Sequence, residues 1–398
     1  MSTVTGFARK RVHRPHSRPR PHDHIEKKPR HSPRLDRSAN CDPKLRVKPG
    51  TTEPGCATLL LDVRQANSME APRPRYSVVI TVHNDREGMS ACLAALLAEP
   101  ECISGDAEVI VVDDRSDDGS GEVAAASGIA SLRLFRIKEK LPGPLTARQE
   151  ALDLGIRAAR GAIVLILDSD ALVTPGWIAC LSSPIEKGIA DAVAGPITFR
   201  PAGKPVAQLQ SADACFYLTI SRLVAYCGGA PGIYFMNFAF HSALYRQCGG
   251  FPRIGTRLTE DLAFARAIHR IGARIAFPSG PSVEVQACKN WGALLKRGRR
   301  VSSGEPSVLA AVLVAWVLSA PILGIALVIS HKLVFAAVLA LRIAAGAALI
   351  ISAAHRYRIR GLGIFPYCYD FVAVAAGIWI AASLYRDPVI EWGGVSYE

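Results

Sequence analysis

Two apolar stretches of the chain end in pairs of acidic residues that could bind a cation. The stretch "AEVIVVDD" closes with Asp113 and Asp114, and "AIVLILDSD" closes with Asp168 and Asp170. Carboxylate pairs are costly in a protein interior and much less so at the mouth of a strand. They suit Mg²⁺ or Mn²⁺, which take oxygen ligands from carboxylates and substrate phosphates. The alternative for either motif alone is a solvated turn, because Asp, Ser and Gly favour turns.

A third acidic motif, Thr259-Glu260-Asp261, opens the helical stretch "LAFARAIHRIGAR". An acid at this place can cap the helix or interact with its dipole. It can also serve as a general base that takes a proton from a reacting hydroxyl group. The residues alone leave both interpretations open.

Short apolar runs alternate with helical stretches in the middle of the chain, which predicts the elements that position these acids. The predicted strands are 76–84, 107–114, 132–137 and 162–170, and the predicted helices are 89–99, 121–130 and 145–161. Such alternation is typical of an α/β fold with a parallel sheet and helices on both faces. Ligands of such sheets bind beyond the carboxyl ends of the strands. We therefore expect the two acidic strand ends to share one site.

Several other site types have little support. The chain has no G-x-x-x-x-G-K-[ST] motif, and the turn after the first strand reads "HNDREGMS" rather than G-x-G-x-x-G. These absences exclude a P-loop and disfavour a dinucleotide-binding domain. The ten cysteines are scattered without a C-x-x-C pair. This pattern disfavours a zinc site and fits a reducing compartment.

Four ordered motifs together resemble the family 2 glycosyltransferases, enzymes of the GT-A fold that use nucleotide-diphosphate sugars. The motifs are "YSVVITVHND", "EVIVVDDRSDDGS", "TARQEALDLGIRAARGAIVLILDSDALVTPGW" and "CGGFPRIGTRLTEDLAFARAIHRIGARIAF". The resemblance covers roughly residues 76 to 300. It implies a membrane-anchored enzyme similar to bacterial members that modify lipids or carotenoids.

The resemblance also implies roles in donor binding. Thr81 and Asn84 match the end of the family's first strand, which contacts the nucleotide through its backbone. Asp113 and Asp114 match the acidic pair that contacts the base and ribose. Arg148 matches a basic residue near the phosphates.

Metal binding and catalysis are implied for the remaining acids. Asp170 matches the metal ligand of the D-x-D motif. Asp168 matches the residue that contacts the nucleotide or the donor sugar, and it is a second candidate ligand of the metal. Asp261 matches the catalytic base, with Glu260 beside it. The family's reaction is a direct attack with inversion, in which Mg²⁺ or Mn²⁺ neutralises the departing diphosphate.

This chain departs from the family pattern in three places. Thr81 and His83 replace a proline and a tyrosine, and Gln149 stands where an asparagine is usual. The segment "KNWGALLKRGRR" lacks the Q-x-x-R-W motif of related membrane synthases, which disfavours a processive polysaccharide synthase. In this segment we expect Arg299 to bind the donor diphosphate; the alternative is a basic collar that faces anionic lipid.

The chain divides into a predicted tail (1–75), a GT-A catalytic domain (76–300) and a membrane region (301–398). Residues 1–50 contain 14 Lys and Arg against 4 Asp and Glu, with few large apolar residues. This composition predicts disorder. The tail either has no role or is attracted to an anionic partner. Anionic lipid and nucleic acid both fit its charge, and we do not expect nucleic acid to be the partner. Met69 is a candidate start.

Three apolar segments follow the catalytic domain, at 307–330, 333–354 and 366–385, and each is close to the length of a spanning helix. They predict a multi-pass protein of the cell (inner) membrane with a lipid-type acceptor. The basic runs 296–300 and 355–360 place the catalytic domain in the cytoplasm. If the third segment crosses the membrane, the chain after it lies on the side opposite the catalytic domain. Yet the ending "VIEWGGVSY" resembles a W-x-G-x-x-Y motif that is expected near the active site.

Three other functions remain as alternatives: a processive polysaccharide synthase, a nucleotidyltransferase on a similar sheet, and a membrane-tethered protein that binds through its basic tail. A nucleotidyltransferase would need a glycine-rich basic loop after the first strand, which "HNDREGMS" does not provide.

Overall fold

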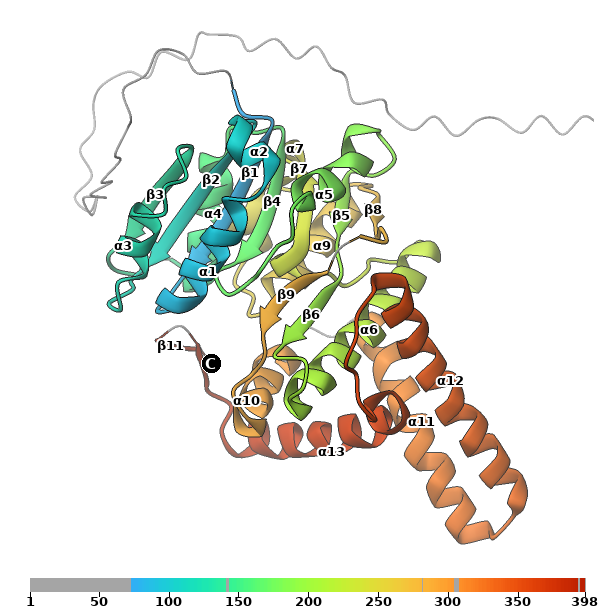
Figure 1. The fold of residues 1–398 in the computed structure, drawn as a ribbon. Helices are drawn as coiled ribbons and strands as arrows, with labels where there is room; N and C mark the ends of the chain where they lie inside the picture. Colours follow the sequence, from blue (N-terminus) through green and yellow to red (C-terminus); the bar gives the residue numbers. More distant parts are fainter. Residues whose placement is uncertain (1–72, 141–142, 281, 304–307, 393, 398) are drawn as a thin grey trace, which may run out of the picture. The chain divides into compact units, whose positions relative to one another are not determined.

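A computed structural model describes residues 73–140, 143–280, 282–303, 308–392 and 394–397 (Figure 1). The predicted tail, with its candidate start at Met69, lies outside the described residues except for its last three positions. The helices are α1 (Arg86–Leu96), α2 (Pro100–Ser104), α3 (Ser120–Ala125), α4 (Ala147–Ala158), α5 (Trp177–Glu186), α6 (Pro205–Tyr226), the 3₁₀ helix η1 (Phe235–Asn237), α7 (Ala243–Gln247), α8 (Gly250–Ile254), α9 (Glu260–Arg270), α10 (Trp291–Ser302), α11 (Val308–Ser330), α12 (Leu333–Tyr357) and α13 (Phe365–Arg386).

The central element is a seven-stranded sheet in the order β3-β2-β1-β4-β7-β5-β8. Its strands are β1 (Tyr76–Val82), β2 (Ala107–Asp114), β3 (Leu132–Ile137), β4 (Ile163–Asp168), β5 (Ala192–Ala194), β7 (Phe238–His241) and β8 (Ile275–Ala276). The first four are mutually parallel, as predicted. The α/β fold class is confirmed, but the sheet is mixed, because β7 runs antiparallel to both β4 and β5. The sequence "FAFH" of β7 is too short to show a periodic pattern.

Side chains of the central strands alternate between two apolar clusters, one on each face of the sheet. Val79 and Ile110 join the cluster that contains the buried side of α4, while Val78 and Val109 join the cluster under α1 and α5. A strand covered on both faces must be apolar along most of its length. This requirement explains why every residue of β1 and β2 is buried.

The chain forms two smaller sheets, one within the α/β domain, by which we mean β1 through α10, and one after the last helix. β6 (Ile197–Arg200) pairs in parallel with β9 (Val283–Gln286), and the C-terminal strands β10 (Ile390–Trp392) and β11 (Val395–Tyr397) form an antiparallel hairpin. The β10–β11 hairpin lies after the last helix in sequence, yet it returns to the α/β domain.

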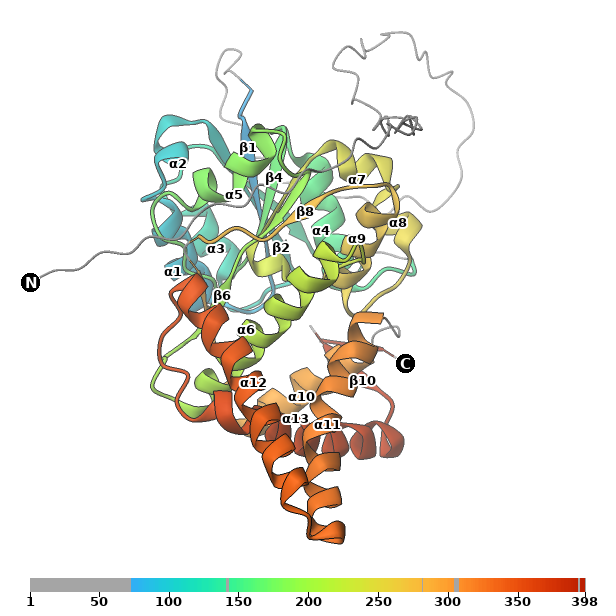
Figure 2. The same ribbon diagram turned by 90° about the vertical axis from the view of Figure 1, so that its right-hand side faces the viewer.

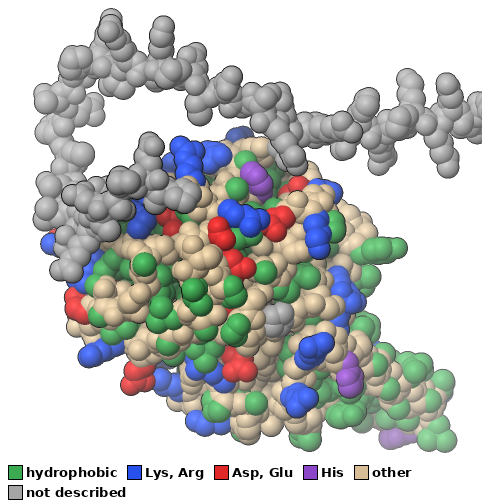
Figure 3. All heavy atoms as spheres, turned by 45° about the horizontal axis from the view of Figure 1, so that its top comes forward, with side chains coloured by type: hydrophobic (Ala, Val, Ile, Leu, Met, Phe, Trp, Pro, Cys, Tyr) green, Lys and Arg blue, Asp and Glu red, His purple; other side chains and the backbone are tan. Residues whose placement is uncertain are grey.

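Three helices are long and apolar enough to cross a membrane: α11 from Ala310, α12 and α13. They match the three predicted segments. Figure 2 shows α11 and α12 side by side as a projecting pair, with α13 lying crosswise to them. In Figure 3, hydrophobic side chains cover the projecting segment at the lower right, while charged side chains are spread over the rest of this face.

A polar network joins the three apolar helices at Arg342 of α12. Its guanidinium forms an ion pair with Asp370 of α13, at 3.1 Å, and both side chains are about one-tenth exposed. It also donates hydrogen bonds to the Ser319 hydroxyl and the Trp316 carbonyl of α11, and it lies 3.7 Å from the centroid of the Trp316 ring. Charged groups among apolar helices are paired in this way because an unpaired charge there is costly.

Both ends of α13 are attached to the α/β domain. Near its start, the Tyr369 hydroxyl donates a hydrogen bond to the Asp213 carboxylate of α6. Just beyond its end, the carbonyl oxygens of Asp387 and Val389 accept hydrogen bonds from Arg299 of α10. A helix that crossed a membrane would have its ends on opposite sides, so these contacts bear directly on the conflict over the third segment.

Candidate active site

The predicted acidic strand ends lie at one edge of the sheet. Thr81 of β1 is paired with Asp168 of β4, and the next residue, Val82, is paired with Asp113 of β2. Because these strands are parallel neighbours, their carboxyl ends must meet at the same edge. The structure therefore brings together the residues that the motifs predicted for donor binding at β1, β2 and β4.

Asn84 holds the loops after β1 and β2 together. Its side-chain oxygen accepts a hydrogen bond of 2.9 Å from the backbone N–H of Asp117. Its backbone N–H donates a hydrogen bond of 3.0 Å to the Ser116 hydroxyl. Asn84 and Arg115 both have positive φ angles, 52° and 61°. Non-glycine residues in this region carry strain that often marks a ligand site. His83 adds a hydrogen bond of 2.6 Å between its Nδ1 and the backbone oxygen of Asp114.

The two carboxylates that end β2 have different partners. Asp113 accepts a hydrogen bond of 3.1 Å from the Ser116 amide, and its other oxygen lies close to the start of α3 beside Gly121. Asp114 forms an ion pair with Arg115 at 2.7 Å. Both side chains are buried. Asp113 thus shapes the turn, and the charge of Asp114 is balanced by the adjacent Arg115.

Arg148 connects the D-x-D motif to the downstream acids. It lies in the first turn of α4, which begins with a capping box between Thr146 and Gln149. The Nε atom donates to Glu260 at 2.7 Å, and Nη2 donates to Asp168. Although burial opposes it, the two carboxylates raise the pKa of Arg148 above its usual value. Arg148 is therefore a cation held between two acids.

Gln149, which replaces the family's asparagine, fixes the segment that leads to the acidic helix α9. Its amide nitrogen donates to the Gly255 carbonyl at 2.9 Å, and its oxygen accepts from the Arg257 amide at 3.0 Å. Gln149 is fully buried. The longer side chain thus positions the loop that precedes Glu260 and Asp261.

Glu260 and Asp261 begin α9 and have different surroundings. Glu260 is 5% exposed and is the partner of Arg148. Asp261 accepts a hydrogen bond of 2.7 Å from the Leu262 amide. Burial and the neighbouring Glu260 charge raise the pKa of Asp261 well above the usual range of an aspartate. A carboxylate with a raised pKa holds a proton more readily, as a general base requires.

Asp170 lies among other acids. Burial, Asp168 and Asp85 raise its pKa to about 7, and Arg297 opposes the shift. A divalent cation would relieve this repulsion. The described residues contain no cluster of three or more His, Cys, Asp or Glu side chains that could hold a metal ion by itself. The donor set thus fits Mg²⁺ or Mn²⁺ only if a diphosphate and water supply the remaining oxygen ligands.

Helix α10 brings Arg297 and Arg300, rather than Arg299, to the acidic site. Arg299 donates its hydrogen bonds to the chain after α13. In contrast, Arg297 influences Asp170, and Arg300 interacts electrostatically with Glu260 and Asp261. Residues three apart share one face of a helix, whereas Arg299 points elsewhere. Arg299, which was expected to bind the donor diphosphate, is therefore directed toward the chain after α13, and Arg297 and Arg300 lie nearer the acids.

Two further residues lie at the site: Arg200, which was not predicted from the sequence, and Tyr397, which belongs to the W-x-G-x-x-Y ending that was expected near the active site. Arg200, at the end of β6, donates a hydrogen bond of 2.7 Å to the Asp170 carbonyl. The Tyr397 hydroxyl in the β10–β11 hairpin accepts a hydrogen bond of 3.1 Å from the Ala147 amide at the start of α4. The hairpin also approaches His83 through Gly394. The ending that resembles W-x-G-x-x-Y thus lies beside the donor end of the site.

An aromatic and acidic cluster lies between Asp261 and α13. Tyr217 and Tyr234 pack with ring centroids 4.9 Å apart, and Tyr369 of α13 bonds Asp213. The Asp213 side chain is exposed in surface terms, yet desolvation raises its pKa. A group surrounded by protein in a concave, water-accessible place has both properties. Burial raises the pKa values of Tyr217 and Tyr234, and the charge of Asp261 adds to the increase, so Asp261 is their neighbour.

Part of the chain is similar to known glycosyltransferases. Residues 77–248 match the model of glycosyl transferase family 2. Glycosyltransferase AglE of Haloferax volcanii is 33% identical over 132 residues, which are 33% of this chain and 42% of that protein. The undecaprenyl-phosphate 4-deoxy-4-formamido-L-arabinose transferase of Aeromonas hydrophila is 35% identical over 102 residues, 24% and 28% of the two chains. The matches thus span less than half the length of these relatives.

Residues 77–248 therefore form a family 2 glycosyltransferase domain, and the resemblance predicted from the motifs is confirmed. Among solved structures, the chain is similar to the mannosyltransferase PcManGT of Pyrobaculum calidifontis in complex with GDP-Man and Mn²⁺. That similarity has a TM-score of 0.45 at 19% identity, over 72% of this chain and 88% of the other.

Proposed function

We propose that this protein is a membrane-associated, inverting glycosyltransferase. It moves a sugar from a nucleotide-diphosphate donor to a hydroxyl group of a lipid-type acceptor. The observation that carries the proposal is the bridge formed by Arg148, which joins Asp168 at the donor end to Glu260 beside Asp261. The bridge brings acids from strand β4 and helix α9 into one site.

In the proposed mechanism, the nucleotide lies across the ends of β1 and β2, near Asn84 and Asp114. Mg²⁺ or Mn²⁺, when bound by Asp170 and Asp168, would neutralise charge on the diphosphate. Arg297 and Arg300 lie where they would stabilise the same departing group. Such preorganised charges act most strongly on the charge that develops as the bond breaks.

Asp261 would act as the general base. It takes the proton of the acceptor hydroxyl as that oxygen attacks the anomeric carbon, while the bond to the diphosphate breaks on the opposite face. One displacement of this kind inverts the anomeric configuration. Glu260, because it is buried against Arg148, is a positioning residue for Asp261 in this scheme.

The lipid-type acceptor is supported by the apolar helices and by the Tyr217–Tyr234–Asp213–Tyr369 cluster. The cluster begins beside Asp261 and ends on α13. An acceptor head group could thus follow hydroxyl and carboxylate groups from a membrane to the base. The name of the Aeromonas relative, which specifies undecaprenyl phosphate, supports a lipid-type acceptor, although the lipid that it names ends in a phosphate rather than a hydroxyl group.

We also propose that α11 and α12 cross the membrane, that α13 does not, and that the α/β domain (76–300 in outline) faces the cytoplasm. The contacts of Tyr369 and Asp387 at the two ends of α13 support this topology. It removes the conflict over the third segment, because the β10–β11 hairpin stays on the same side as the site.

The deciding experiment is a donor screen with the membrane-bound protein, Mg²⁺ or Mn²⁺, and extracted lipids. Release of nucleoside diphosphate with a single sugar added to a lipid is the expected result. A long polymer would identify a polysaccharide synthase, and pyrophosphate release from a nucleoside triphosphate would identify a nucleotidyltransferase. Deletion of residues 1–68 should leave transfer intact; its loss would favour the tail-binding alternative.

A further inference from the structure

The turn between β1 and α1 contacts the D-x-D motif as well as the loop after β2. Asp85 of this turn accepts a hydrogen bond of 2.7 Å from the hydroxyl of Ser169, the middle residue of D-x-D, although 84 residues separate the two in the sequence. Asp85 directly follows Asn84, which holds the loops after β1 and β2 together. One short turn therefore connects the part of the site proposed for the nucleotide with the part proposed for the cation.

Asp85 is itself held in place by contacts that do not involve the D-x-D motif. It is the N-cap of α1, and its Oδ1 atom accepts a hydrogen bond of 3.2 Å from the backbone N–H of Gly88. Its own backbone N–H donates to the Ser120 hydroxyl at 3.0 Å. A Cβ atom at Gly88 would lie 2.2 Å from the Asp85 carboxylate, so a larger residue would displace it. Because Asp85 is anchored independently, it can position Ser169 rather than follow it.

The backbone on both sides of Ser169 is also held by the surrounding elements. The Cys92 thiol of α1 donates a weak hydrogen bond of 3.7 Å to the Asp168 carbonyl. Arg200, at the end of β6, donates one of 2.7 Å to the Asp170 carbonyl. Of the three contacts, that of the Ser169 hydroxyl is the one made by a side chain of the motif. The spacing of the two D-x-D carboxylates therefore depends on how this turn is fixed.

Asp85 would act on a cation from outside its coordination shell. Both of its carboxylate oxygens already accept hydrogen bonds, from Ser169 and Gly88. Its charge nevertheless reaches the motif, because it adds to the effects of burial and of Asp168 that raise the pKa of Asp170. Groups that hold metal ligands in place from outside typically cost about 10–100-fold in metal affinity when they are removed. Asp85 has both properties of such a group, a bond to the motif and a charge near it.

We propose that Asp85 is a positioning residue of the divalent-cation site. Through Ser169 it holds the D-x-D turn so that Asp168 and Asp170 present their carboxylates at a fixed spacing. Through its neighbour Asn84 it joins this turn to the loops proposed for the nucleotide. The inference rests on the proposed function, which assigns the cation and the diphosphate to this edge of the sheet, and it adds a residue that lies outside the D-x-D and Thr-Glu-Asp motifs.

The test measures binding by the full chain in detergent. Mn²⁺ affinity is measured by the resonance signal of free Mn²⁺ at a saturating concentration of GDP or UDP, whichever the parent binds. Affinity for the same nucleotide is measured by calorimetry in the presence of a chelator.

The variants separate the bond to the motif from the helix cap. Ser169→Ala removes the hydroxyl and leaves the cap of α1 intact, whereas Ser169→Thr keeps a hydroxyl. Asp85→Asn removes the charge and keeps an oxygen that can cap the helix. Ser104→Ala is the matched control, because the Ser104 hydroxyl donates to the Asp106 carboxylate at 3.1 Å at the opposite end of β2.

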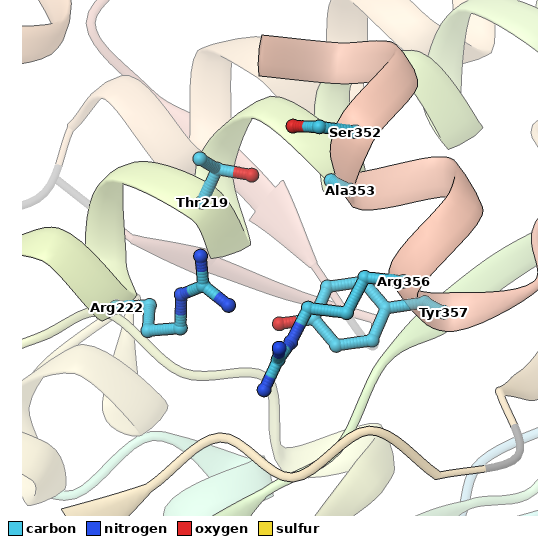
Figure 4. A pocket seen from close by; sticks show the side chains of 6 residues that line it. All are labelled: Thr219, Arg222, Ser352, Ala353, Arg356 and Tyr357. Atoms are coloured by element: carbon cyan, nitrogen blue, oxygen red, sulfur yellow. The ribbon is translucent and has the colours of Figure 1, made fainter.

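A cavity of about 220 Å³ between α6 and α12 could also bind the nucleotide, so it requires its own control. It is lined by Thr219, Arg222, Ser352, Ala353, Arg356 and Tyr357, none of which belongs to the candidate active site. Figure 4 shows Arg222 and Arg356 extending toward the same space from the two helices. Guanidinium groups bind phosphate well. Arg356→Gln should bind the nucleotide and Mn²⁺ as the parent does; a loss of binding would place the measured site in this cavity and overturn the proposal.

Ser169→Ala and Asp85→Asn should each weaken Mn²⁺ binding by about tenfold or more, while nucleotide affinity in the chelator stays at the parent value. Ser169→Thr should restore most of the Mn²⁺ affinity, and Ser104→Ala should match the parent. Parent-like Mn²⁺ affinity in Ser169→Ala would overturn the role of Asp85 and leave the proposed function standing. An equal loss of Mn²⁺ and nucleotide binding that Ser169→Thr does not restore would also overturn it. If the parent itself binds no Mn²⁺ with the nucleotide, the proposed donor site fails together with this inference.

Discussion

Arg148 and Glu260 are joined by a hydrogen bond of 2.7 Å from Nε to Oε1, although 112 residues separate them in the sequence. The same guanidinium donates to Asp168 through Nη2. A planar fork can reach two carboxylates at once, which a lysine ammonium on a flexible stem cannot reproduce. The position of the proposed base relative to the donor therefore depends on this one side chain.

We expect Arg148→Lys to lower kcat/KM at least about tenfold, because the bridge loses its fork geometry. Arg148→Ala should also destabilise the fold by roughly 3–5 kcal/mol, since the buried Glu260 is left unpaired. Nucleoside diphosphate release and denaturant unfolding measure the two effects. Arg157→Ala is the control: this residue pairs with Asp153 on the exposed side of the same helix, and its loss should cost less than about 1 kcal/mol. Equal effects at positions 148 and 157 would contradict the bridging role.

Asp261→Asn should reduce sugar transfer by about 10²–10⁴-fold, the usual contribution of a general base. Binding of the nucleoside diphosphate with metal should change little, because Asp261 is placed at the acceptor side. Calorimetric titration with the diphosphate and Mn²⁺ gives the second measurement. Near-normal turnover of the variant would refute the assignment.

The raised pKa of Asp261 makes a prediction about stability and pH. Its folded-state pKa lies above its unfolded value, because burial and Glu260 disfavour the charged form. Such a group stabilises the fold below its unfolded pKa, and this contribution is lost as the pH rises through the folded pKa. Asp261→Asn should therefore gain thermal stability relative to the parent as the pH rises from 4 to 8. Parallel midpoint curves for the two proteins would show that the pKa is not shifted.

The same shift predicts the acid limb of the reaction. If Asp261 must be ionised to accept a proton, kcat/KM should fall with decreasing pH at a higher pH than an ordinary aspartate would give. The pH profile of diphosphate release measures this limb. A plateau that persists down to pH 4 would argue against Asp261 as the base.

Asp170→Asn should weaken metal-dependent binding of the donor while leaving metal-independent binding largely unchanged. The reason is that Asp170 lies in a concentration of negative charge formed with Asp168 and Asp85. Titration of the nucleoside diphosphate with Mn²⁺ and with a chelator separates the two modes. Asp117→Asn serves as the control, because Asp117 is exposed on the loop after β2. The metal role fails if both variants bind alike.

Tyr397→Phe should raise KM for the donor several-fold, with a smaller effect on kcat. The substitution removes the hydroxyl that accepts from the Ala147 amide at the start of α4, one residue before Arg148. Ser396→Ala, on the exposed side of the same strand, should have parent-like kinetics. An unchanged KM in Tyr397→Phe would mean that the β10–β11 hairpin does not support the donor site.

The gathering of Thr81, Asp113 and Asp168 was predictable, because apolar parallel strands must end at a common edge. The choice among the arginines of α10 was also within reach, since a spacing of three residues puts Arg297 and Arg300 on one face. The sequence prediction chose Arg299 from a basic segment that lacks the Q-x-x-R-W motif. Helical periodicity was the stronger signal there.

Other features had no local signal. The link between Arg148 and Glu260 depends on how α9 packs beside α4, which no sequence period reports. Arg200 reaches Asp170 from a short strand of a separate sheet. Hydropathy predicts α13 as a third membrane crossing, because it measures only length and apolar content. The contacts at the two ends of this helix show that both ends lie against the α/β domain.

Under the proposed topology, the Arg342 network has a consequence for how the protein enters the membrane during synthesis. An arginine near the centre of an inserting helix costs about 2.5–3.5 kcal/mol on translocon-based scales. The Ser319 hydroxyl and the Trp316 carbonyl, both on α11, are made before Arg342 and can receive its hydrogen bonds. Helices α11 and α12 are therefore expected to leave the translocon as a pair, and Asp370 neutralises the charge only after α13 has emerged from the ribosome.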